Sequence, residues 1–473
     1  STQRREPLHN WSPLHLDERA ADVLYVSFER ITGVIEVERV DKRVRVYCGT
    51  QIADLARRLH AEGLTLPAIP APGVISVGGA IAIGAHGSRL NDSEPGLFEW
   101  PGTISATIAE ATVIAWNGER YVAKRLSQGM PELAFASVNL GRVLLVDVTL
   151  RVREDYCLFV EFTRHQANVL LGAEQSPNSL SELLKHQNME VLGFRAVPGT
   201  APRMHGIAWR STTRPPGDWR RETFLNKFVQ ARGALTSLVE QLPWKLIARQ
   251  AHMKADALLD SNSVGDFEIG PAAAERIYVT SDTLKVEPLG WALVLPRRDL
   301  QTAAHRLYRE SQRLLEHSSV SERVHQHLAF ELRFAELDTM GQPPGALPPT
   351  LSVGAPVRGD GRHVVMWVNI LTIQTRLTKE ARAPYLRAFE EFLLAQANAE
   401  GWIARPEWSK GWAYGEREAW TWSAERMQRL LADSWPGDEH DASSWAFARA
   451  TAWKLDPHGV FSTPFHDRLL PRL

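Results

Sequence analysis

The sequence predicts an α+β fold, and three observations support this. Short strands dominate the first 150 residues, long amphipathic helices separated by strands appear after about residue 155, and the two kinds of element do not alternate regularly. A doubly wound dinucleotide-binding domain would show a regular strand–helix alternation. With 473 residues, the chain is long for one hydrophobic core and comfortable for two.

The first third should form a small sheet with one helix. Polar and apolar residues alternate in 43–48, which is the pattern of a half-buried strand. A helix should follow, because Ile52, Leu55 and Leu59 recur three or four residues apart. Thr50 is placed to cap its start. The strands expected in this part are 23–26, 33–37, 43–48, 106–116 and 142–152.

The middle of the chain combines long amphipathic helices with strands. Amphipathic helices are expected at 224–242 and 298–317. The strands expected there are 267–279, 283–294, 324–334 and 363–370. Eight of the 16 tryptophans follow residue 400, in a tail without a repeat period. We therefore divide the chain into 1–154, 155–400 and 401–473.

Composition and charge indicate an ordinary globular protein. With 44% hydrophobic residues, a formal net charge of −1 and a pI near 7.0, the chain lacks the basic character of a nucleic-acid-binding protein. No apolar run is long enough to predict a membrane span. The residues from Ser1 to Arg5 lack the basic-then-apolar pattern of a secretory signal, so we expect a cytoplasmic protein. Secretion stays open as an alternative, because the chain opens abruptly.

The sequence does not support a disulfide framework or a metal site. Cys48 and Cys157 each lie in an apolar, strand-like run, so both thiols should be buried and inert. His325 and His327 share one face of a strand but lack a third ligand of suitable spacing, so no metal is expected. There is also no strand followed by G-x-G-x-x-G, no P-loop, no H-E-x-x-H and no G-x-S-x-G.

The most informative stretch is 70–88, which is rich in glycine, proline and alanine. Its prolines stiffen the start, and its glycines let the backbone approach a bulky group closely. Small residues leave backbone N–H groups accessible, which suits an anionic pyrophosphate. His86 is flanked by Ala85 and Gly87, so nothing should shield its ring. On residue types alone, a tight turn with a buried, hydrogen-bonded histidine is an equal alternative.

The order of residues in this stretch narrows the choice. The pattern P-A-P-G-x-x-[ST]-V-G-G-x-x-A-x-G-x-H-G-[ST] resembles the FAD-binding loop of the vanillyl-alcohol oxidase (PCMH-type) family and is closest to the covalent-flavin cholesterol oxidases. The resemblance implies that His86 bonds covalently to the 8α carbon of the FAD isoalloxazine. The cofactor-binding residues that it implies are Pro72, Gly73, Val77, Gly78, Gly79, Gly84, His86, Gly87, Ser88, Gly102, Ser105 and Val148.

The same resemblance implies the domain plan. Residues 1–154 would form the first part of a two-part FAD-binding domain, and the tail 401–473 would complete that domain and the active site. Residues 155–400 would form a substrate-binding domain with an antiparallel sheet flanked by helices. The further segments that resemble the family are 11–14, 102–105, 140–142, 148–152, 406–412 and 455–461.

Two departures from the family pattern stand out. Arg5 to His9 lies where the family has R-G-x-x-H against the pyrophosphate, but without the glycine, and almost nothing precedes it. Either that part of the family's chain is missing here, or half of the FAD site differs. Residues 160–320 show little resemblance, and this is where the shape of the substrate should be set.

The strand at 324–334 carries the first candidate catalytic residues. Its apolar side chains point one way, while Glu331 and Arg333 point the other way and are close enough to pair. A solvent-facing salt bridge is the ordinary alternative. The covalent-flavin cholesterol oxidases have a similar Glu-x-Arg strand beside the flavin, where the pair is thought to gate an oxygen channel.

The other candidates follow from the same resemblance. Asn369, which shares a strand face with Trp367, resembles an active-site asparagine, and Glu407 and Lys410 resemble residues that line the pocket. An exposed ion pair on a loop is the alternative for the last two. A carboxylate with a raised pKa would take the hydroxyl proton, and both Glu331 and Glu407 are candidates. Arg333 would stabilise negative charge on the substrate or the reduced flavin.

The implied activity is that of an FAD-dependent oxidase. It would take hydride from an alcohol carbon of a bulky, apolar substrate, either a sterol or a specialised metabolite, and molecular oxygen would be reduced to hydrogen peroxide. One alternative is oxidative decarboxylation of a β-hydroxy acid, with Arg333 or Lys410 near its carboxylate. A non-catalytic flavin-binding protein is the other. The sequence does not predict the oligomeric state.

Overall fold

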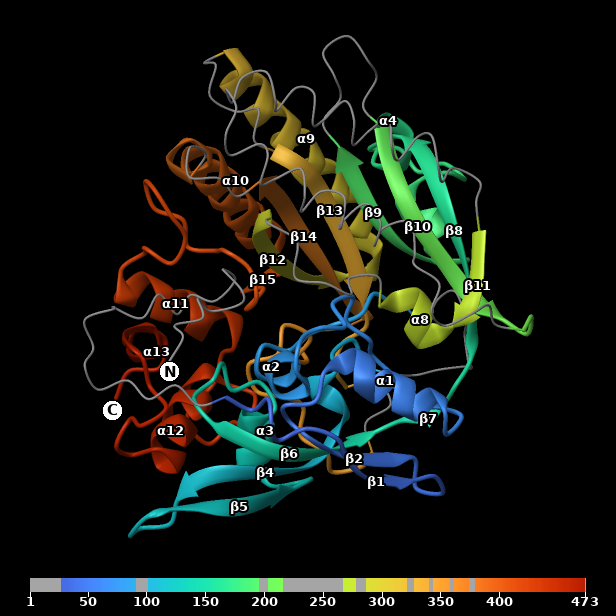
Figure 1. Cartoon of the computed structure of the whole chain (residues 1–473). Helices are drawn as coiled ribbons and strands as arrows, with labels where there is room; N and C mark the ends of the chain where they lie inside the picture. The colour runs from blue at the N-terminus through green and yellow to red at the C-terminus, as the bar shows by residue number, and fades with distance from the viewer. Residues whose placement is uncertain are drawn as a thin grey trace, which may run out of the picture.

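The structure is a computed structural model of the whole chain, and it contains two main antiparallel sheets (Figure 1). It describes residues 27–90, 101–194, 203–215, 267–277, 286–320, 327–339, 343–357, 361–373 and 379–472. The strands are not interleaved with helices in a regular alternation, so the α+β prediction is confirmed.

The smaller sheet has five strands in the order β1-β2-β6-β4-β5. Its strands are β1 (Val34–Glu38), β2 (Arg43–Tyr47), β4 (Ile108–Trp116), β5 (Tyr121–Ser127) and β6 (Leu144–Arg151). Buried and half-buried residues alternate along β4, because one face of a strand packs on the core. A two-stranded sheet of β3 (Leu64–Thr65) and β7 (Arg153–Glu154) lies at its margin.

Three short helices accompany this sheet. Helix α1 (Ile52–His60) buries Ile52, Leu55 and Leu59, as its periodicity predicts. The helix that the structure forms within 70–88 is α2 (Val77–Ala82), and the hydroxyl of Ser76 caps it by accepting from the backbone N–H of Gly79. Helix α3 is Pro131–Ala136.

The larger sheet has eight strands in the order β11-β8-β10-β9-β13-β14-β12-β15. Its first four strands along the chain are β8 (Cys157–Gln166), β9 (Asn188–Phe194), β10 (Arg203–Thr212) and β11 (Phe267–Pro271). The other four are β12 (Val286–Pro296), β13 (His327–Ala335), β14 (His363–Ile373) and β15 (Ile403–Pro406).

Two long helices, α9 (Leu300–Val320) and α10 (Lys379–Glu400), cover one face of the large sheet (Figure 1). Phe330 of β13 makes edge-on contacts with Tyr308 of α9 and Phe389 of α10. Since neighbouring residues of a strand point to opposite faces, Glu331 and Arg333 lie on the face away from these helices. That face is directed toward the segment 70–88, because Trp367, which lies opposite Arg333 on β14, stacks on the ring of His86.

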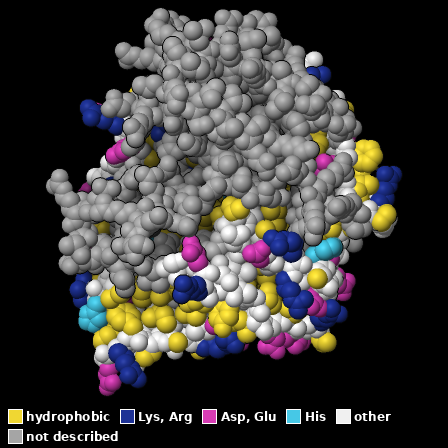
Figure 2. All heavy atoms as spheres, viewed as in Figure 1, with side chains coloured by type: hydrophobic (Ala, Val, Ile, Leu, Met, Phe, Trp, Pro, Cys, Tyr) yellow, Lys and Arg dark blue, Asp and Glu magenta, His cyan; other side chains and the backbone are white. Residues whose placement is uncertain are grey.

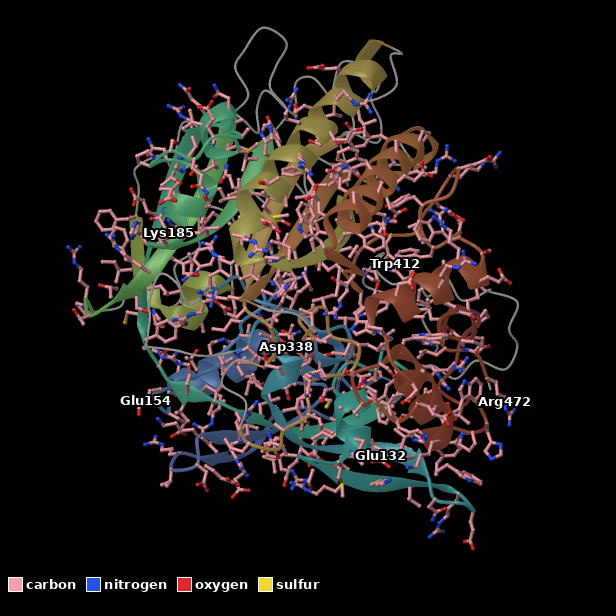
Figure 3. The ribbon with its side chains drawn as sticks, turned by 180° about the vertical axis from the view of Figure 1, so that it is seen from behind. Glu132, Glu154, Lys185, Asp338, Trp412 and Arg472 are labelled. Atoms are coloured by element: carbon pink, nitrogen blue, oxygen red, sulfur yellow. The ribbon has the colours of Figure 1, made fainter. Side chains whose placement is uncertain are left out.

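The tail contacts both sheets. Its first strand, β15, pairs with β12 of the large sheet, whereas α12 (Trp445–Leu455) packs against α3 and β4. The remaining tail helices are α11 (Ala424–Ser434) and α13 (Pro464–Leu469). Figure 3 shows Trp412 between α10 and these tail helices.

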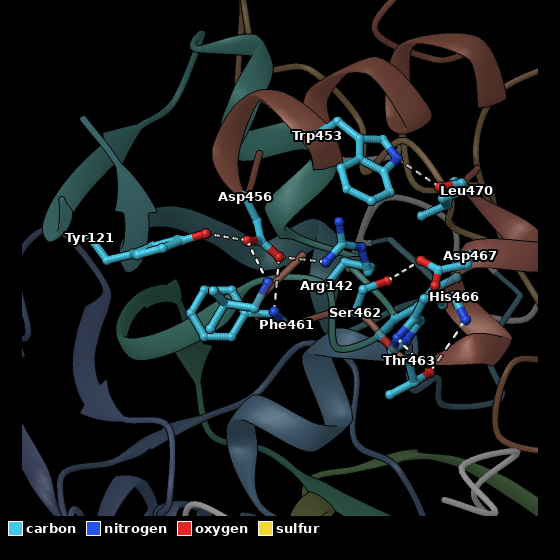
Figure 4. Close-up of polar contacts among 12 residues, drawn as sticks. Tyr121, Arg142, Trp453, Asp456, Phe461, Ser462, Thr463, His466, Asp467 and Leu470 are labelled. Atoms are coloured by element: carbon cyan, nitrogen blue, oxygen red, sulfur yellow. Dashed lines mark hydrogen bonds and ion pairs between the residues drawn. The ribbon is translucent and has the colours of Figure 1, made fainter. Parts of the chain in front are cut away.

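A buried polar cluster fixes the tail to the small sheet (Figure 4). Asp456 lies 2.6 Å from Arg142, and both side chains are almost fully buried. Asp456 also accepts the backbone N–H groups of Val460 and Phe461 and the hydroxyl of Tyr121. Burial, followed by the contact with Asp456, raises the pKa of Tyr121 to about 12. The segment 455–461 therefore has a structural role in joining the tail to the rest of the chain.

Several local predictions need correction. The strand expected at 267–279 is wrong for residues 272–276, because Ala272 begins helix α8 (Ala272–Arg276) and alanine has the highest helix propensity. Cys48 is buried, and burial raises its pKa to about 12, but Cys157 is only partly buried. The helix expected at 224–242, the strand at 23–26 and His325 lie outside the described residues.

The outer surface is mixed in charge. Basic and acidic side chains are interspersed over the lower, described part of the face in Figure 2. Of the helices that the structure describes, none has both the length and the hydrophobicity to cross a membrane. Within the same residues, no group of three or more histidine, cysteine or carboxylate side chains is arranged to hold a metal ion.

Candidate active site

The loop that carries His86 is anchored to the end of the large sheet. The backbone of His86 pairs with that of Thr103, and Arg89 pairs with Ala335 at the end of β13. Asp338 accepts hydrogen bonds from the backbone N–H and the hydroxyl of Thr103. Figure 3 shows Asp338 at the level where the two main sheets meet. These contacts place the His86 segment against the sheet face that carries Glu331 and Arg333.

Two glycines of the loop are required by its geometry. Gly84 has φ +62°, a left-handed conformation that favours glycine. A Cβ atom on Gly102 would lie 2.6 Å from the carbonyl oxygen of Glu336, which is far inside contact distance. The glycine at 102 therefore allows the close approach between the loop and the end of the sheet.

His86 is buried, with 8% of its surface exposed. Its ring stacks on that of Trp367 from β14, with 3.7 Å between ring centroids and 5° between ring planes. Its Nε2 lies 3.4 Å from Oε1 of Glu407, and its Nδ1 lies 3.0 Å from the carbonyl oxygen of Gly87. The prediction that nothing shields the ring is therefore wrong, because a residue distant in sequence covers one face.

Glu331 and Arg333 form the predicted ion pair, and the pair is buried. Nη2 of Arg333 lies 3.0 Å from Oε1 of Glu331. The second oxygen of Glu331 accepts from Nδ2 of Asn369 at 2.9 Å, which is possible because the two residues are directly opposite on β13 and β14. The ordinary alternative, a solvent-facing salt bridge, does not fit a glutamate that is 5% exposed.

Sequence reasoning missed one member of this cluster, Glu190. It lies on β9, next to β13, and its Oε2 is 3.7 Å from Nε of Arg333. Arg333 is therefore held by two carboxylates. The only signal in the sequence is an acidic residue in the apolar run 189–194, and that signal does not reveal which strand lies beside it.

Glu407 and Lys410 complete the cluster from the tail. Their charged atoms are 3.8 Å apart, and Glu407 is buried. The backbone N–H of Glu407 donates to the carbonyl of Gly290 on β12. A Cβ on Gly290 would lie 2.5 Å from Cγ of Lys410 and 2.8 Å from Oδ1 of Asn369, so the glycine gives both side chains their room. All five predicted catalytic residues thus belong to one cluster.

The pKa values of the two glutamates contradict the expectation of a raised pKa. Burial raises the pKa of Glu407, but Lys410 and His86 outweigh it and lower the value to about 2. The pKa of Glu331 is also lowered, because Arg333 and Lys410 outweigh the effect of burial. Both carboxylates are therefore ionised at neutral pH.

The predicted cofactor residues fall into two groups. Gly84, Gly87, Ser88 and Gly102 lie next to His86, in the segments that anchor the loop. The rest differ in exposure: Gly73, Val77, Ser105 and Val148 are buried, Pro72 and Gly78 are half-buried, and Gly79 is exposed. The hydroxyl of Ser105 donates its proton to the carbonyl oxygen of Ile81, so it could only accept a hydrogen bond from a cofactor.

Four buried polar atoms around His86 indicate that the site is built for a ligand. Among the residues that the structure describes, Oγ of Ser88, Nε1 of Trp367, Oδ1 of Asn369 and Oε2 of Glu407 have no hydrogen-bond partner. Buried polar atoms in folded proteins are nearly always paired. They comprise one indole N–H donor, two oxygen acceptors and one hydroxyl, so a ligand that pairs with all four must both accept and donate hydrogen bonds. The isoalloxazine of FAD, with ring nitrogens and carbonyl oxygens, fits this requirement.

Comparison with known families agrees with this assignment. The model of an FAD-binding domain matches residues 9–123, and that of a cholesterol oxidase substrate-binding domain matches residues 245–471. Two solved structures have similar folds over 93% of this chain and 84% of theirs. They are the cholesterol oxidase from Brevibacterium sterolicum, with TM-score 0.79 and 23% identity, and a solvent-stable cholesterol oxidase, with TM-score 0.80 and 22% identity.

A curated relative matches only part of the chain. Alditol oxidase from a Streptomyces species is 28% identical over 125 residues, which are 26% of this chain and 27% of the relative. The chain thus spans about a quarter of the length of the curated relatives that it matches.

Proposed function

Because this chain belongs to the flavoproteins that join an FAD-binding domain to a substrate-binding domain of the cholesterol oxidase type, we propose that it is an FAD-dependent oxidase of alcohols. The observation that carries the proposal is the set of four buried polar atoms around His86 that have no hydrogen-bond partner in the described part of the chain. Bound there, FAD would accept two electrons from the alcohol carbon and pass them to molecular oxygen, which gives hydrogen peroxide.

His86 is the residue that would carry FAD covalently. It ends the FAD-binding loop, and its ring is held by Trp367 on one face and by Glu407 at Nε2. Two fixed contacts hold the imidazole in one orientation, which favours bond formation at a defined atom of the cofactor. The sheet face and the tail, and not the loop alone, therefore prepare the histidine for attachment.

Glu407 is the better of the two candidate bases. Both oxygens of Glu331 are engaged, one by Arg333 and one by Asn369, whereas Oε2 of Glu407 has no partner among the described residues. A carboxylate of low pKa suffices here, because the hydroxyl proton becomes strongly acidic as the hydride leaves the carbon. Asn369 would then orient the substrate hydroxyl, and Lys410 would keep Glu407 ionised.

Two measurements test this function. Denatured protein should stay yellow and fluoresce on a gel, and His86→Ala should release the flavin into the supernatant while the fold is retained. The loaded protein should produce peroxide with at least one member of a panel of sterols, alkyl alcohols and aryl alcohols. Flavin that leaves the intact protein on denaturation would refute covalent attachment, and a loaded protein inert across the panel would favour the non-catalytic flavin-binding alternative.

A further inference from the structure

Glu390 of α10 places a fully buried carboxyl group against the tail. Its Oε1 accepts from the backbone N–H of Ala413 at 2.7 Å, and its Oε2 accepts from the backbone N–H of Tyr414 at 2.8 Å. The indole Nε1 of Trp291, on β12, donates to the same Oε1 at 3.0 Å. One side chain thus joins a helix, a strand of the large sheet and the backbone of the tail.

Keeping this carboxyl group inside the protein is unfavourable by itself. Burial raises the pKa of Glu390 to about 8, although the N–H donors of Tyr414, Ala413 and Trp291 act to lower it. An apolar side chain of similar volume would fill the same space without the desolvation of a polar group. The value of the carboxyl group therefore lies in the backbone groups that it holds.

The backbone that Glu390 holds belongs to a short tail segment, residues 407–414. Both the N–H and the carbonyl of Gly411 are bonded to the backbone of β12. Ala413 has φ +56°, a left-handed conformation that is unfavourable for a residue with a Cβ atom. Glu390 bonds the N–H of this same residue, so its contact opposes relaxation of the segment to an ordinary conformation.

This segment is the part of the tail that supplies the cluster around His86. Lys410 lies directly before the residue bonded to β12 and three residues before Ala413. We propose that Glu390 is a positioning residue, which fixes the end of the segment 407–414 and so keeps the side chains of Glu407 and Lys410 at the cluster. The effect on catalysis rests on the proposed oxidase function, whereas the fixing of the segment does not.

The first test measures the mobility of the segment and does not depend on turnover. Hydrogen–deuterium exchange of the flavin-loaded protein is followed in peptides that cover 407–414. The side-chain amide in Glu390→Gln has a single oxygen, so one of the two tail N–H groups loses its acceptor. Exchange in these peptides should become about 2- to 10-fold faster, which corresponds to the net contribution of one hydrogen bond.

The second test asks whether the segment acts through Glu407. Anaerobic stopped-flow gives the rate of flavin reduction, per bound flavin, by the most reactive alcohol of the panel. Glu390→Gln should slow this step by about 10- to 100-fold, which is the usual cost of a displaced reacting group. In a Glu407→Gln background the same substitution should change the rate by less than about twofold, because no base is left to position.

Two further variants support the assignment. Glu391→Gln is the matched control, because Glu391 is the next residue of α10 but is exposed, and both of its measurements should match the wild type. Trp291→Phe removes one N–H donor from the carboxyl group of Glu390 and keeps an aromatic ring. It should therefore change both measurements in the same direction as Glu390→Gln, by a smaller factor.

The outcomes separate this inference from the proposed function. Unchanged exchange in both Glu390→Gln and Trp291→Phe would overturn the positioning role. Equal slowing of flavin reduction by Glu390→Gln with and without Glu407 would overturn it too, because that pattern indicates a general structural effect. Faster exchange in a protein that oxidises no alcohol would leave the fixing of the segment standing and refute only the oxidase function.

Discussion

Substituting Lys410 by methionine should move the pH dependence of flavin reduction. The charged atoms of Lys410 and Glu407 are 3.8 Å apart in a buried cluster. At an effective dielectric constant of about 20, this separation corresponds to an attraction of about 4 kcal/mol, or roughly three pKa units as an upper bound. Without the lysine, the effect of burial is opposed chiefly by His86 and Arg333, so the pKa of Glu407 should rise from about 2 by one to three units.

The sign of the effect follows from the role of Glu407. A base acts only when ionised, so a raised pKa leaves more of it protonated at low pH and slows the reaction there. Anaerobic stopped-flow reduction of the wild-type flavin should be independent of pH down to about pH 4. In Lys410→Met the acid limb should move upward by one to three units, into the measurable range.

Matched variants separate this effect from a general loss of charge. Lys185→Met removes a surface lysine paired with Glu182, on the opposite side of the view in Figure 3 from Trp412, so its profile should match the wild type. Glu407→Gln should slow reduction per bound flavin by about 10²- to 10⁴-fold, which is the usual contribution of a positioned base. An acid limb that stays unchanged in Lys410→Met would show that Glu407 is not the base.

Three further predictions test other parts of the structure. Glu331→Gln and Arg333→Met should have strongly non-additive effects on the rate of flavin reoxidation by oxygen in a double-mutant cycle, because the two side chains are paired at 3.0 Å. Additive effects would mean that the two residues act independently. Asp456→Asn should lower the free energy of unfolding by about 3 to 5 kcal/mol in urea melts, since it leaves a buried arginine uncompensated. Glu154→Gln, which loses an exposed pair with Lys42, should leave the free energy of unfolding almost unchanged. Trp367→Phe should retain covalent flavin, because an aromatic ring can still stack on the imidazole of His86. Trp367→Ala should reduce the flavin fluorescence of the denatured protein on a gel. Equal fluorescence of the two variants would count against a positioning role for Trp367.

The sequence predicts well what depends on local pattern. The alternation along β13 places Glu331 and Arg333 on the polar face, and the periodicity of α1 identifies its buried side. Errors arise where a distant segment decides the outcome. Trp367 shields His86 from a position 281 residues away, and the low pKa of Glu407 depends on His86 and Arg333 as well as on its neighbour in the sequence, Lys410. Glu190 was missed for the same reason, because strand order is set by tertiary packing and not by spacing.

The position of the site at the junction of three segments has a chemical consequence. The FAD-binding loop supplies His86, the large sheet supplies Asn369 and the Glu331–Arg333 pair, and the tail supplies Glu407 and Lys410. Oε1 of Glu407 contacts His86, while Oε2 has no hydrogen-bond partner among the residues that the structure describes. Glu407 thus contacts the residue proposed to carry the cofactor and is itself the group proposed to take the substrate proton. On this proposal, attachment of FAD and oxidation of the alcohol would both depend on the same docking of the tail, which Asp456 and Arg142 secure from the opposite end.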